Sequence, residues 1–298
     1  MCGIVGLFLK DDTLKPELGG LLADMLITMT DRGPDSAGIA VYGNGDGAIG
    51  KMTIQSDQPD TDFPVLEALL EEAAGKAASL ERNDTHAVIT APSDRLVEIE
   101  AHLAASHDGL RVMSRGEAME IYKEVGLPAA VIDRFGVRAM QGTHGIGHTR
   151  MATESAVTTM GAHPFSTATD ECLVHNGSLS NHNSLRRMLV REGMHFETEN
   201  DTEVGAAYMT HRMQNGANLG EALEDCLGAL DGFYTFVVGT RRGFGVLRDP
   251  IACKPAVLAE TDRYVAFGSE YRALVNLPGI LDARVWEPEP ATVYFWEH

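Results

Sequence analysis

The spacing of apolar residues predicts strands at the start of the chain, with one helix between them. A continuous apolar run at Ile4–Leu9 indicates a buried strand. Apolar residues at helical spacing over Pro16–Thr30 predict a helix with proline in its first turn. Strands are predicted at Ser36–Tyr42 and Ala48–Ile54, and the glycine-rich turn between them predicts that they form a hairpin.

The pattern then changes to short alternating segments, which predict a small α/β lobe inserted at about 55–138. The elements expected within this lobe are a helix at 65–80, a strand at 86–91, a helix at 94–105, a strand at 110–113 and helices at 117–124 and 128–135. No stretch of this lobe carries a motif with recognisable chemistry.

After Gly142 the chain returns to strands, then helices, then strands again. The expected strands are 143–151, 171–175, 234–240, 244–248, 256–259, 264–268 and 292–296, and the expected helices are 181–192, 202–214 and 219–230. This order predicts an α+β fold with two sheets covered by helices on their outer faces, forming one domain over 1–298 that the lobe interrupts.

Composition narrows the class of protein. The chain has 298 residues, of which 44% are hydrophobic and 22% charged, as expected for a packed globular protein. A formal charge of -19 argues against nucleic acid or an anionic membrane as a partner. No signal peptide or membrane-spanning run is recognised, and no C-x-x-C pair occurs among the cysteines, so we expect a cytoplasmic protein. The cysteines are Cys2, Cys172, Cys226 and Cys253.

Two local patterns have simple structural interpretations. The segment GDGAIG fits G-x-G-x-x-G, but a strand follows it where a dinucleotide site requires a helix, so a turn is expected. His144 and His148 raise the question of a metal site. Residues four apart on a strand are separated by roughly 13 Å, so structural histidines are the favoured interpretation.

Four polar stretches stand where core strands or their turns are expected. Each alone fits a turn or a helix N-cap. They are DRGPDSAG at 31–38, GHTRMAT at 147–153, HNGSLSN at 175–181 and NDTEV at 200–204.

If these stretches converge, they form a site for a free amino acid. Arg150 lies inside a strand-like run, where a buried guanidinium requires an anion, and it would bind an α-carboxylate. Asp201 would bind an α-ammonium group. Asn176 and Gly177 offer an amide and a backbone N–H for an oxyanion hole. None of the stretches supplies a nucleophile, which leaves Cys2 as the candidate.

In this order, MCGIVG, RGPDSAG, GHTRMAT, HNGSLSN and NDTEV resemble the class II glutamine amidotransferases, which are N-terminal-nucleophile (Ntn) hydrolases. The segments RDPIACKPAVLAE and FGSE resemble the same family, and the similarity covers residues 1–54 and about 140–275. The resemblance implies the four-layer αββα sandwich of these enzymes.

The resemblance also implies a role for each matching residue. Removal of Met1 exposes Cys2, whose thiol attacks the side-chain amide of glutamine while its own α-amine acts as the base. Asn176 and Gly177 stabilise the tetrahedral intermediate. The remaining matching residues bind the substrate head group or support the nucleophile: Arg150, Asp201, Thr153 and Arg32.

The inserted lobe makes the chain similar to stand-alone glutamate-synthase-like subunits. It matches best the amidotransferase-like subunit of N-methylglutamate synthase, because of its length, its insertion and Met151, where relatives often have an aromatic residue. Glu154 stands where some relatives have histidine. The resemblance implies glutamine or γ-glutamylmethylamide as substrate and no cofactor in this chain.

The same resemblance implies a hetero-oligomer. The expected partners are a flavin (FMN) and iron–sulfur subunit similar to glutamate synthase and a glycine-repeat β-helix subunit. A different class of function remains open, namely a non-catalytic amino-acid-binding or scaffold subunit whose N-terminus is not processed.

Overall fold

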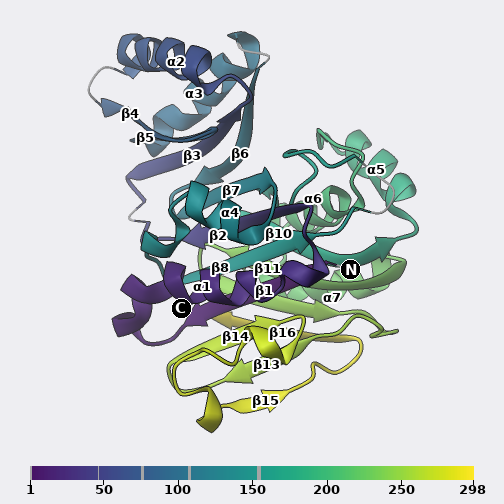
Figure 1. The fold of residues 1–298 in the computed structure, drawn as a ribbon. Helices are drawn as coiled ribbons and strands as arrows, with labels where there is room; N and C mark the ends of the chain where they lie inside the picture. The colour runs from purple at the N-terminus through teal and green to yellow at the C-terminus, as the bar shows by residue number, and fades with distance from the viewer. Residues whose placement is uncertain (1, 46, 75–76, 107–108, 153–155) are drawn as a thin grey trace.

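Two antiparallel sheets stacked face to face form the body of the protein (Figure 1). The computed structural model describes residues 2–45, 47–74, 77–106, 109–152 and 156–298. Within these residues the larger sheet consists, in spatial order, of β15 (Arg284–Trp286), β13 (Val257–Glu260), β14 (Tyr264–Gly268), β1 (Gly3–Leu9), β8 (His144–Arg150), β2 (Ser36–Tyr42) and β7 (Met119–Val125). The smaller sheet consists of β16 (Thr292–Glu297), β12 (Gly243–Arg248), β11 (Gly232–Thr240), β10 (Glu171–Leu179) and β9 (Phe165–Ala168).

The two sheets share an apolar core. Ile4, Phe8 and Ile146 of the larger sheet pack with Val174 and Phe244 of the smaller one. These positions alternate along their strands with residues of the outer faces, as the period of a strand requires. The strands of the two sheets are thus buried on both faces, and this explains why they occur in the sequence as nearly continuous apolar runs.

Helices cover the outer face of each sheet. The helices are α1 (Leu18–Ile27) and α4 (Pro128–Arg134) on the larger sheet, and α5 (His182–Arg191), α6 (Asp201–Gln214) and α7 (Leu219–Ala229) on the side of the smaller one. Shorter 3₁₀ turns are η1 (Asp12–Glu17), η2 (Thr30–Arg32), η4 (Val137–Ala139), η5 (Tyr271–Ala273) and η6 (Ile280–Asp282). The helix–sheet–sheet–helix order confirms the predicted αββα fold.

The inserted lobe has its own sheet and its own core. The sheet contains β4 (Ser79–Asn83), β5 (His86–Pro92), β3 (Ile49–Ser56) and β6 (Leu110–Gly116), in the order β4-β5-β3-β6. α2 (Pro59–Ala74) and α3 (Ser93–Ser106) cover it, and the lobe stands above the sandwich in Figure 1. The strands of this separate sheet lie within residues 49–116, whereas the insertion is predicted at about 55–138.

Two of the predicted elements are wrong. The predicted hairpin does not form, because β2 pairs with β7 and β8 whereas β3 pairs with β5 and β6. The helix predicted at 117–124 does not form, because strand β7 occupies Met119–Val125. Met119 and Ile121 point into the core between the sheets while Tyr122 faces the outer core, so apolar residues occur on both faces and the period of two is obscured.

The lobe is fastened to the sandwich at the β6–β7 turn. The carboxylate of Asp170, in the turn between β9 and β10, accepts hydrogen bonds from the backbone N–H groups of Glu117, Ala118 and Met119 at 2.9–3.0 Å.

Nothing in the described helices combines the length and apolar character needed to cross a bilayer.

Candidate active site

Antiparallel pairing brings three distant strand ends to one edge of the larger sheet. Gly3 of β1 lies opposite Thr149 of β8, and Ser36 of β2 lies opposite Arg150. The start of β1, the end of β8 and the start of β2 therefore meet. This arrangement places Cys2, which precedes β1, beside the end of the strand that carries Arg150.

Three of the predicted site residues are in direct contact. The carbonyl oxygen of Cys2 accepts a hydrogen bond from Arg32 Nε at 2.9 Å and another from Asn176 Nδ2 at 3.2 Å. The start of β1, which follows, is also held, because Ile4 N–H donates to Ser269 Oγ and Ser269 N–H donates to the Ile4 carbonyl, both at 2.9 Å. Cys2 itself is half-buried.

Arg32 is held from its other side by a residue that the sequence analysis did not select. Its Nη1 lies 2.7 Å from Glu270 Oε1, and Glu270 Oε2 also binds Arg272 Nε at 2.8 Å. Gly33 lets this segment approach β8, since an added Cβ would lie 2.5 Å from the carbonyl carbon of Thr149. The FGSE segment that resembles the family thus contributes two anchors, Ser269 and Glu270.

Arg150 is buried at the end of β8, with 6% of its surface exposed. Its Nη1 donates to the Ala156 carbonyl at 3.2 Å. Asp35 fixes the backbone on both sides of Met151: its N–H donates to the Arg150 carbonyl at 3.1 Å, and its Oδ2 accepts from Ala152 N–H at 2.8 Å. The stretch DRGPDSAG therefore organises the stretch GHTRMAT.

Gly177 follows Asn176 on β10 and occupies a backbone conformation that favours glycine, with φ at +150°. An added Cβ would lie 1.9 Å from the carbonyl oxygen of Phe233 on the neighbouring strand. The structure therefore requires glycine beside Asn176.

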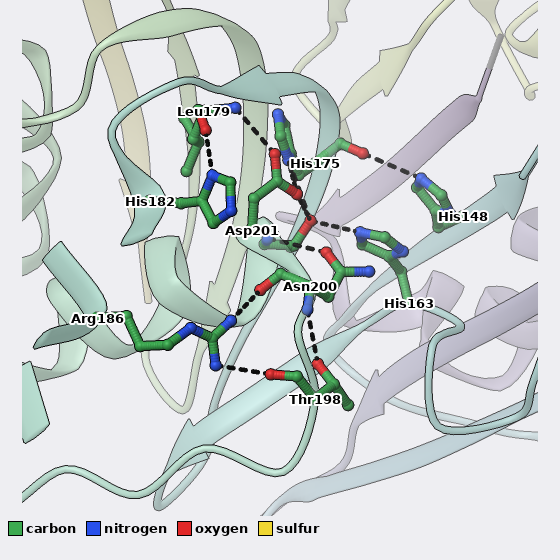
Figure 2. Close-up of polar contacts among 10 residues, drawn as sticks. His148, His163, His175, Leu179, His182, Arg186, Thr198, Asn200 and Asp201 are labelled. Carbon is green, nitrogen blue, oxygen red and sulfur yellow. Dashed lines mark hydrogen bonds and ion pairs between the residues drawn. The ribbon is translucent and has the colours of Figure 1, made fainter. Parts of the chain in front are cut away.

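Asp201 is the first residue of α6, next to the smaller sheet. Its Oδ2 accepts from Leu179 N–H at 2.8 Å, and its Oδ1 lies 3.7 Å from His175 Nδ1 (Figure 2). Burial alone would raise the pKa of Asp201, but the neighbouring His175 and the Leu179 N–H lower it overall. The positive end of the helix dipole also favours a carboxylate at this position.

A set of buried histidines surrounds Thr202, which follows Asp201. His163 Nε2 and His175 Nδ1 both bond to Thr202 Oγ1, at 2.7 and 3.0 Å, and His148 Nε2 donates to the His175 carbonyl at 3.0 Å (Figure 2). The rings of His148 and His163 stack at 4.0 Å. Burial lowers the pKa of His148 to about 3 and that of His163 well below its usual value, so both are neutral near pH 7.

These histidines serve as hydrogen-bonded spacers. His144 lies elsewhere, with its Nε2 bonded to the Thr240 carbonyl at 2.9 Å. In the part of the chain that the structure describes, no group of three or more His, Cys, Asp or Glu side chains is arranged to hold a metal ion. Thr153, Glu154 and Met1 lie outside the described residues, so the structure does not place them.

Comparison with known proteins bears on the family of the chain. Residues 148–276 match the family model of the glutamine amidotransferase domain. A glutamine amidotransferase-like protein, GlxB, of Rhizobium meliloti (strain 1021) is 67% identical over 298 residues, which cover 100% of this chain and 99% of the relative.

The chain belongs to the glutamine amidotransferase family. A putative glutamine amidotransferase of Methanothermobacter thermautotrophicus is also similar along its whole length, with 34% identity and 99% of each chain covered. The fold is similar to that of the glutamine phosphoribosylpyrophosphate amidotransferase of B. subtilis, with a TM-score of 0.63 and 19% identity. That alignment covers 99% of this chain and 47% of the solved one, so the present chain spans about half of the B. subtilis protein.

Proposed function

We propose that this protein is a glutaminase-type amidohydrolase subunit that cleaves the side-chain amide of glutamine through a thioester on Cys2. The main observation in its support is that Arg32 and Asn176 both donate hydrogen bonds to the carbonyl oxygen of Cys2. Together with Arg150 and Asp201, a cysteine held in this way supplies the groups that amide hydrolysis by an N-terminal nucleophile requires.

The chemistry begins with removal of Met1, which frees the α-amine of Cys2. An N-terminal amine has a pKa of about 7.7–8.0, so a substantial fraction is neutral near pH 7.5 and can accept the thiol proton. The thiolate attacks the amide carbon, and the amide oxygen gains the negative charge. The proton passes to the leaving amine, which departs. Water then attacks the thioester and releases glutamate and the free thiol.

Asn176 and Gly177 are the proposed donors to the oxyanion. An amide NH2 group has two hydrogens, so Asn176 can hold the Cys2 carbonyl with one and reach the oxyanion with the other. A single donor of this kind is worth about 10²–10³ in kcat in a preorganised site.

The head group of the substrate requires two partners from the protein, a cation for its α-carboxylate and an anion for its α-ammonium group. Arg150 is the proposed partner of the α-carboxylate, with assistance from Thr153, and Asp201 is the proposed partner of the α-ammonium. Both described residues lie at the same end of the sandwich as Cys2 and Asn176, and the lowered pKa of Asp201 supports its ionised form. Arg32 supports the nucleophile through its hydrogen bond to Cys2.

The finer proposal concerns the amine and its destination. We infer that the chain passes ammonia or methylamine to a glutamate-synthase-like partner containing FMN and iron–sulfur clusters, with a glycine-repeat β-helix subunit, as in N-methylglutamate synthase. An amine released without a neighbouring acceptor would be lost to solvent. Met151, 37% exposed next to Arg150, is the side chain proposed to border an N-methyl group.

The test compares L-glutamine with γ-glutamylmethylamide. Both are offered to the purified chain and to the native complex, and amine release and methylamine-dependent product are measured. Hydrolysis that Cys2→Ala abolishes supports the glutaminase reaction. Turnover of glutamine alone, with no methylamine-dependent product from the complex, would rule out the finer assignment and leave the glutaminase reaction standing.

A further inference from the structure

A buried lysine holds residues 160–164, which precede β9. Lys123 of β7 is 3% exposed. Its Nζ donates to the carbonyl oxygens of Ala162 at 2.9 Å, Pro164 at 3.2 Å and Met160 at 3.4 Å. It also lies 4.6 Å from the centroid of the Phe165 ring. A buried ammonium group is costly, and these carbonyls and the ring replace the water it has lost.

The clasped segment, residues 159–165, runs directly across the larger sheet. Lys123 lies opposite Gly38 of β2, and an added Cβ on Gly38 would be 2.0 Å from the carbonyl oxygen of His163. The next residue of β7 holds the same segment, because Thr159 Oγ1 donates to Glu124 Oε1. Two consecutive residues of one strand therefore fix the segment at both ends.

A cavity of about 450 Å³ borders the segment. It is lined by Met160, Phe165 and Lys123 and by residues of β6 and of the loop at 192–198. The interior of a protein is normally close-packed, so a segment that borders a cavity depends more strongly on its polar contacts. For this segment those contacts come from Lys123, from Glu124 and from the bond of His163 to Thr202.

The clasped segment contacts Thr202, next to Asp201, and lies beside Arg150, so it adjoins both residues proposed to bind the substrate head group. His163 bonds through Nε2 to Thr202 Oγ1, and Thr202 follows Asp201 at the start of α6. Arg150 Nη1 lies 3.3 Å from the position that a Cβ of Gly161 would take. The segment is thus a spacer between the proposed ammonium partner and the proposed carboxylate partner.

We propose that Lys123 is a positioning residue of the substrate site: by holding residues 160–164 of the clasped segment it sets the spacing between Arg150 and Asp201. This inference rests on the proposed function, because the spacing matters only if the two residues bind one amino acid. Lys123 does not touch the reacting atoms. Its loss should therefore weaken substrate binding and leave the nucleophile in place.

Charge around Lys123 favours its protonated form. Burial lowers the pKa of Lys123 to about 8, while the carboxylates of Glu197 and Glu203 act in the opposite direction. Near pH 7 the group is therefore mainly an ammonium with three donors, which matches the three carbonyls that it contacts.

The test uses Cys2→Ala as the parent, so that L-glutamine binds without being consumed. Its dissociation constant is measured by calorimetry for the parent and for the parent carrying Lys123→Met, Lys123→Arg or Lys51→Met. We expect Lys123→Met to weaken binding about tenfold. Lys123→Arg should restore most of the affinity, since the guanidinium keeps its donors and the cavity gives it room.

Lys51→Met is the matched control. Lys51 lies on β3 and pairs at 2.6 Å with Glu120, which is on β7 like Lys123. Lys51 does not contact the clasped segment, so glutamine binding should not change. In proteins that retain Cys2, Lys123→Met should raise KM for glutamine with little change in kcat, and alkylation of Cys2 by iodoacetamide should proceed at the wild-type rate.

Wild-type affinity in a folded Lys123→Met protein would overturn the inference. If that variant does not fold, Thr159→Val decides, because it removes only the bond to Glu124. We expect Thr159→Val to weaken binding two- to fivefold, and unchanged binding would overturn the inference. Absence of any glutamine binding by the Cys2→Ala parent would contradict the proposed function itself, and the inference with it.

Discussion

Arg32 donates its Nε–H to the carbonyl oxygen of Cys2 at 2.9 Å, across 30 residues of sequence. The same guanidinium is 7% exposed and pairs with Glu270 through Nη1. Cys2 has therefore a fixed backbone position before any substrate is bound. A nucleophile at a chain terminus needs such support, because terminal residues are poorly ordered unless they are tied down.

Arg32→Lys tests this support. Lysine keeps the charge but cannot reach Cys2 and Glu270 at once with a planar fork of donors. We expect kcat for glutamine to fall by about 10- to 100-fold, corresponding to about 1.4–2.7 kcal/mol. Arg272→Lys is the control, because Arg272 also binds Glu270 but does not touch Cys2 in the structure. A wild-type kcat for Arg32→Lys would show that the contact has no role in catalysis.

Asp201→Asn separates the charge of this side chain from its hydrogen bond. An asparagine oxygen still accepts from Leu179 N–H, so the start of α6 should be kept. The negative charge proposed to meet the substrate ammonium is lost. We expect KM for glutamine to rise about 10- to 100-fold with a smaller change in kcat, as for the loss of a charged hydrogen bond. Asp225→Asn, at a half-exposed pair with Arg212, should leave both constants unchanged.

Gly177→Ala should disturb the proposed oxyanion site and the sheet together. The added methyl group would lie 1.9 Å from the Phe233 carbonyl oxygen, so the backbone of β10 must move away from β11. We expect a loss of thermal stability and a loss of most hydrolysis. Gly193→Ala is a useful comparison, since Gly193 also has positive φ but no atom within 4 Å of its Cβ position. Equal effects of the two substitutions would mean that backbone strain alone explains the result.

Buried histidines should make the fold sensitive to acid. Burial lowers the pKa of His86, His144 and His148 to about 3 in the folded protein, against about 6.5 in the unfolded chain. Between these values the unfolded state binds more protons, so the free energy of unfolding falls as the pH falls from 6.5 toward 3. Each such histidine contributes a slope of up to about 1.4 kcal/mol per pH unit.

Urea denaturation at pH 7.5, 6.0 and 5.0 measures this slope. His144→Gln should reduce the slope by about one proton between pH 6 and 5, because Gln cannot be protonated there. An unchanged slope in this variant would show that His144 is not the buried neutral group described here.

The site could be predicted from the sequence to the extent that its residues lie at strand ends. Arg150 ends a strand of the larger sheet, and antiparallel pairing brings that strand end beside the start of β1, which Cys2 precedes. Because the polar stretches offer no nucleophile, Cys2 was the candidate, and the family resemblance implies the same role for it. The contact of Arg32 and Asn176 with one carbonyl could not be foreseen, because it depends on how the two sheets stack.

Lys123 was missed for a physical reason. Its strand is covered on both faces, so its apolar residues do not alternate and the pattern resembled a helix. Lys123 points toward residues 160–164 because β7 pairs with β2. The sequence predicted a different partner for β2, namely the strand at Ala48–Ile54. Glu270 was likewise missed, because its role comes from a contact with Arg32 across 238 residues.

The central claim, that Cys2 is the nucleophile, is tested most directly by covalent trapping. The native protein is treated with 6-diazo-5-oxo-L-norleucine, an electrophilic analogue of glutamine, and its intact mass and labelled peptide are determined. The proposed mechanism predicts a chain without Met1 that carries one adduct on Cys2, with labelling slowed by excess L-glutamine. A chain that retains Met1 and takes up no adduct, or an adduct on the exposed Cys253 alone, would contradict the mechanism.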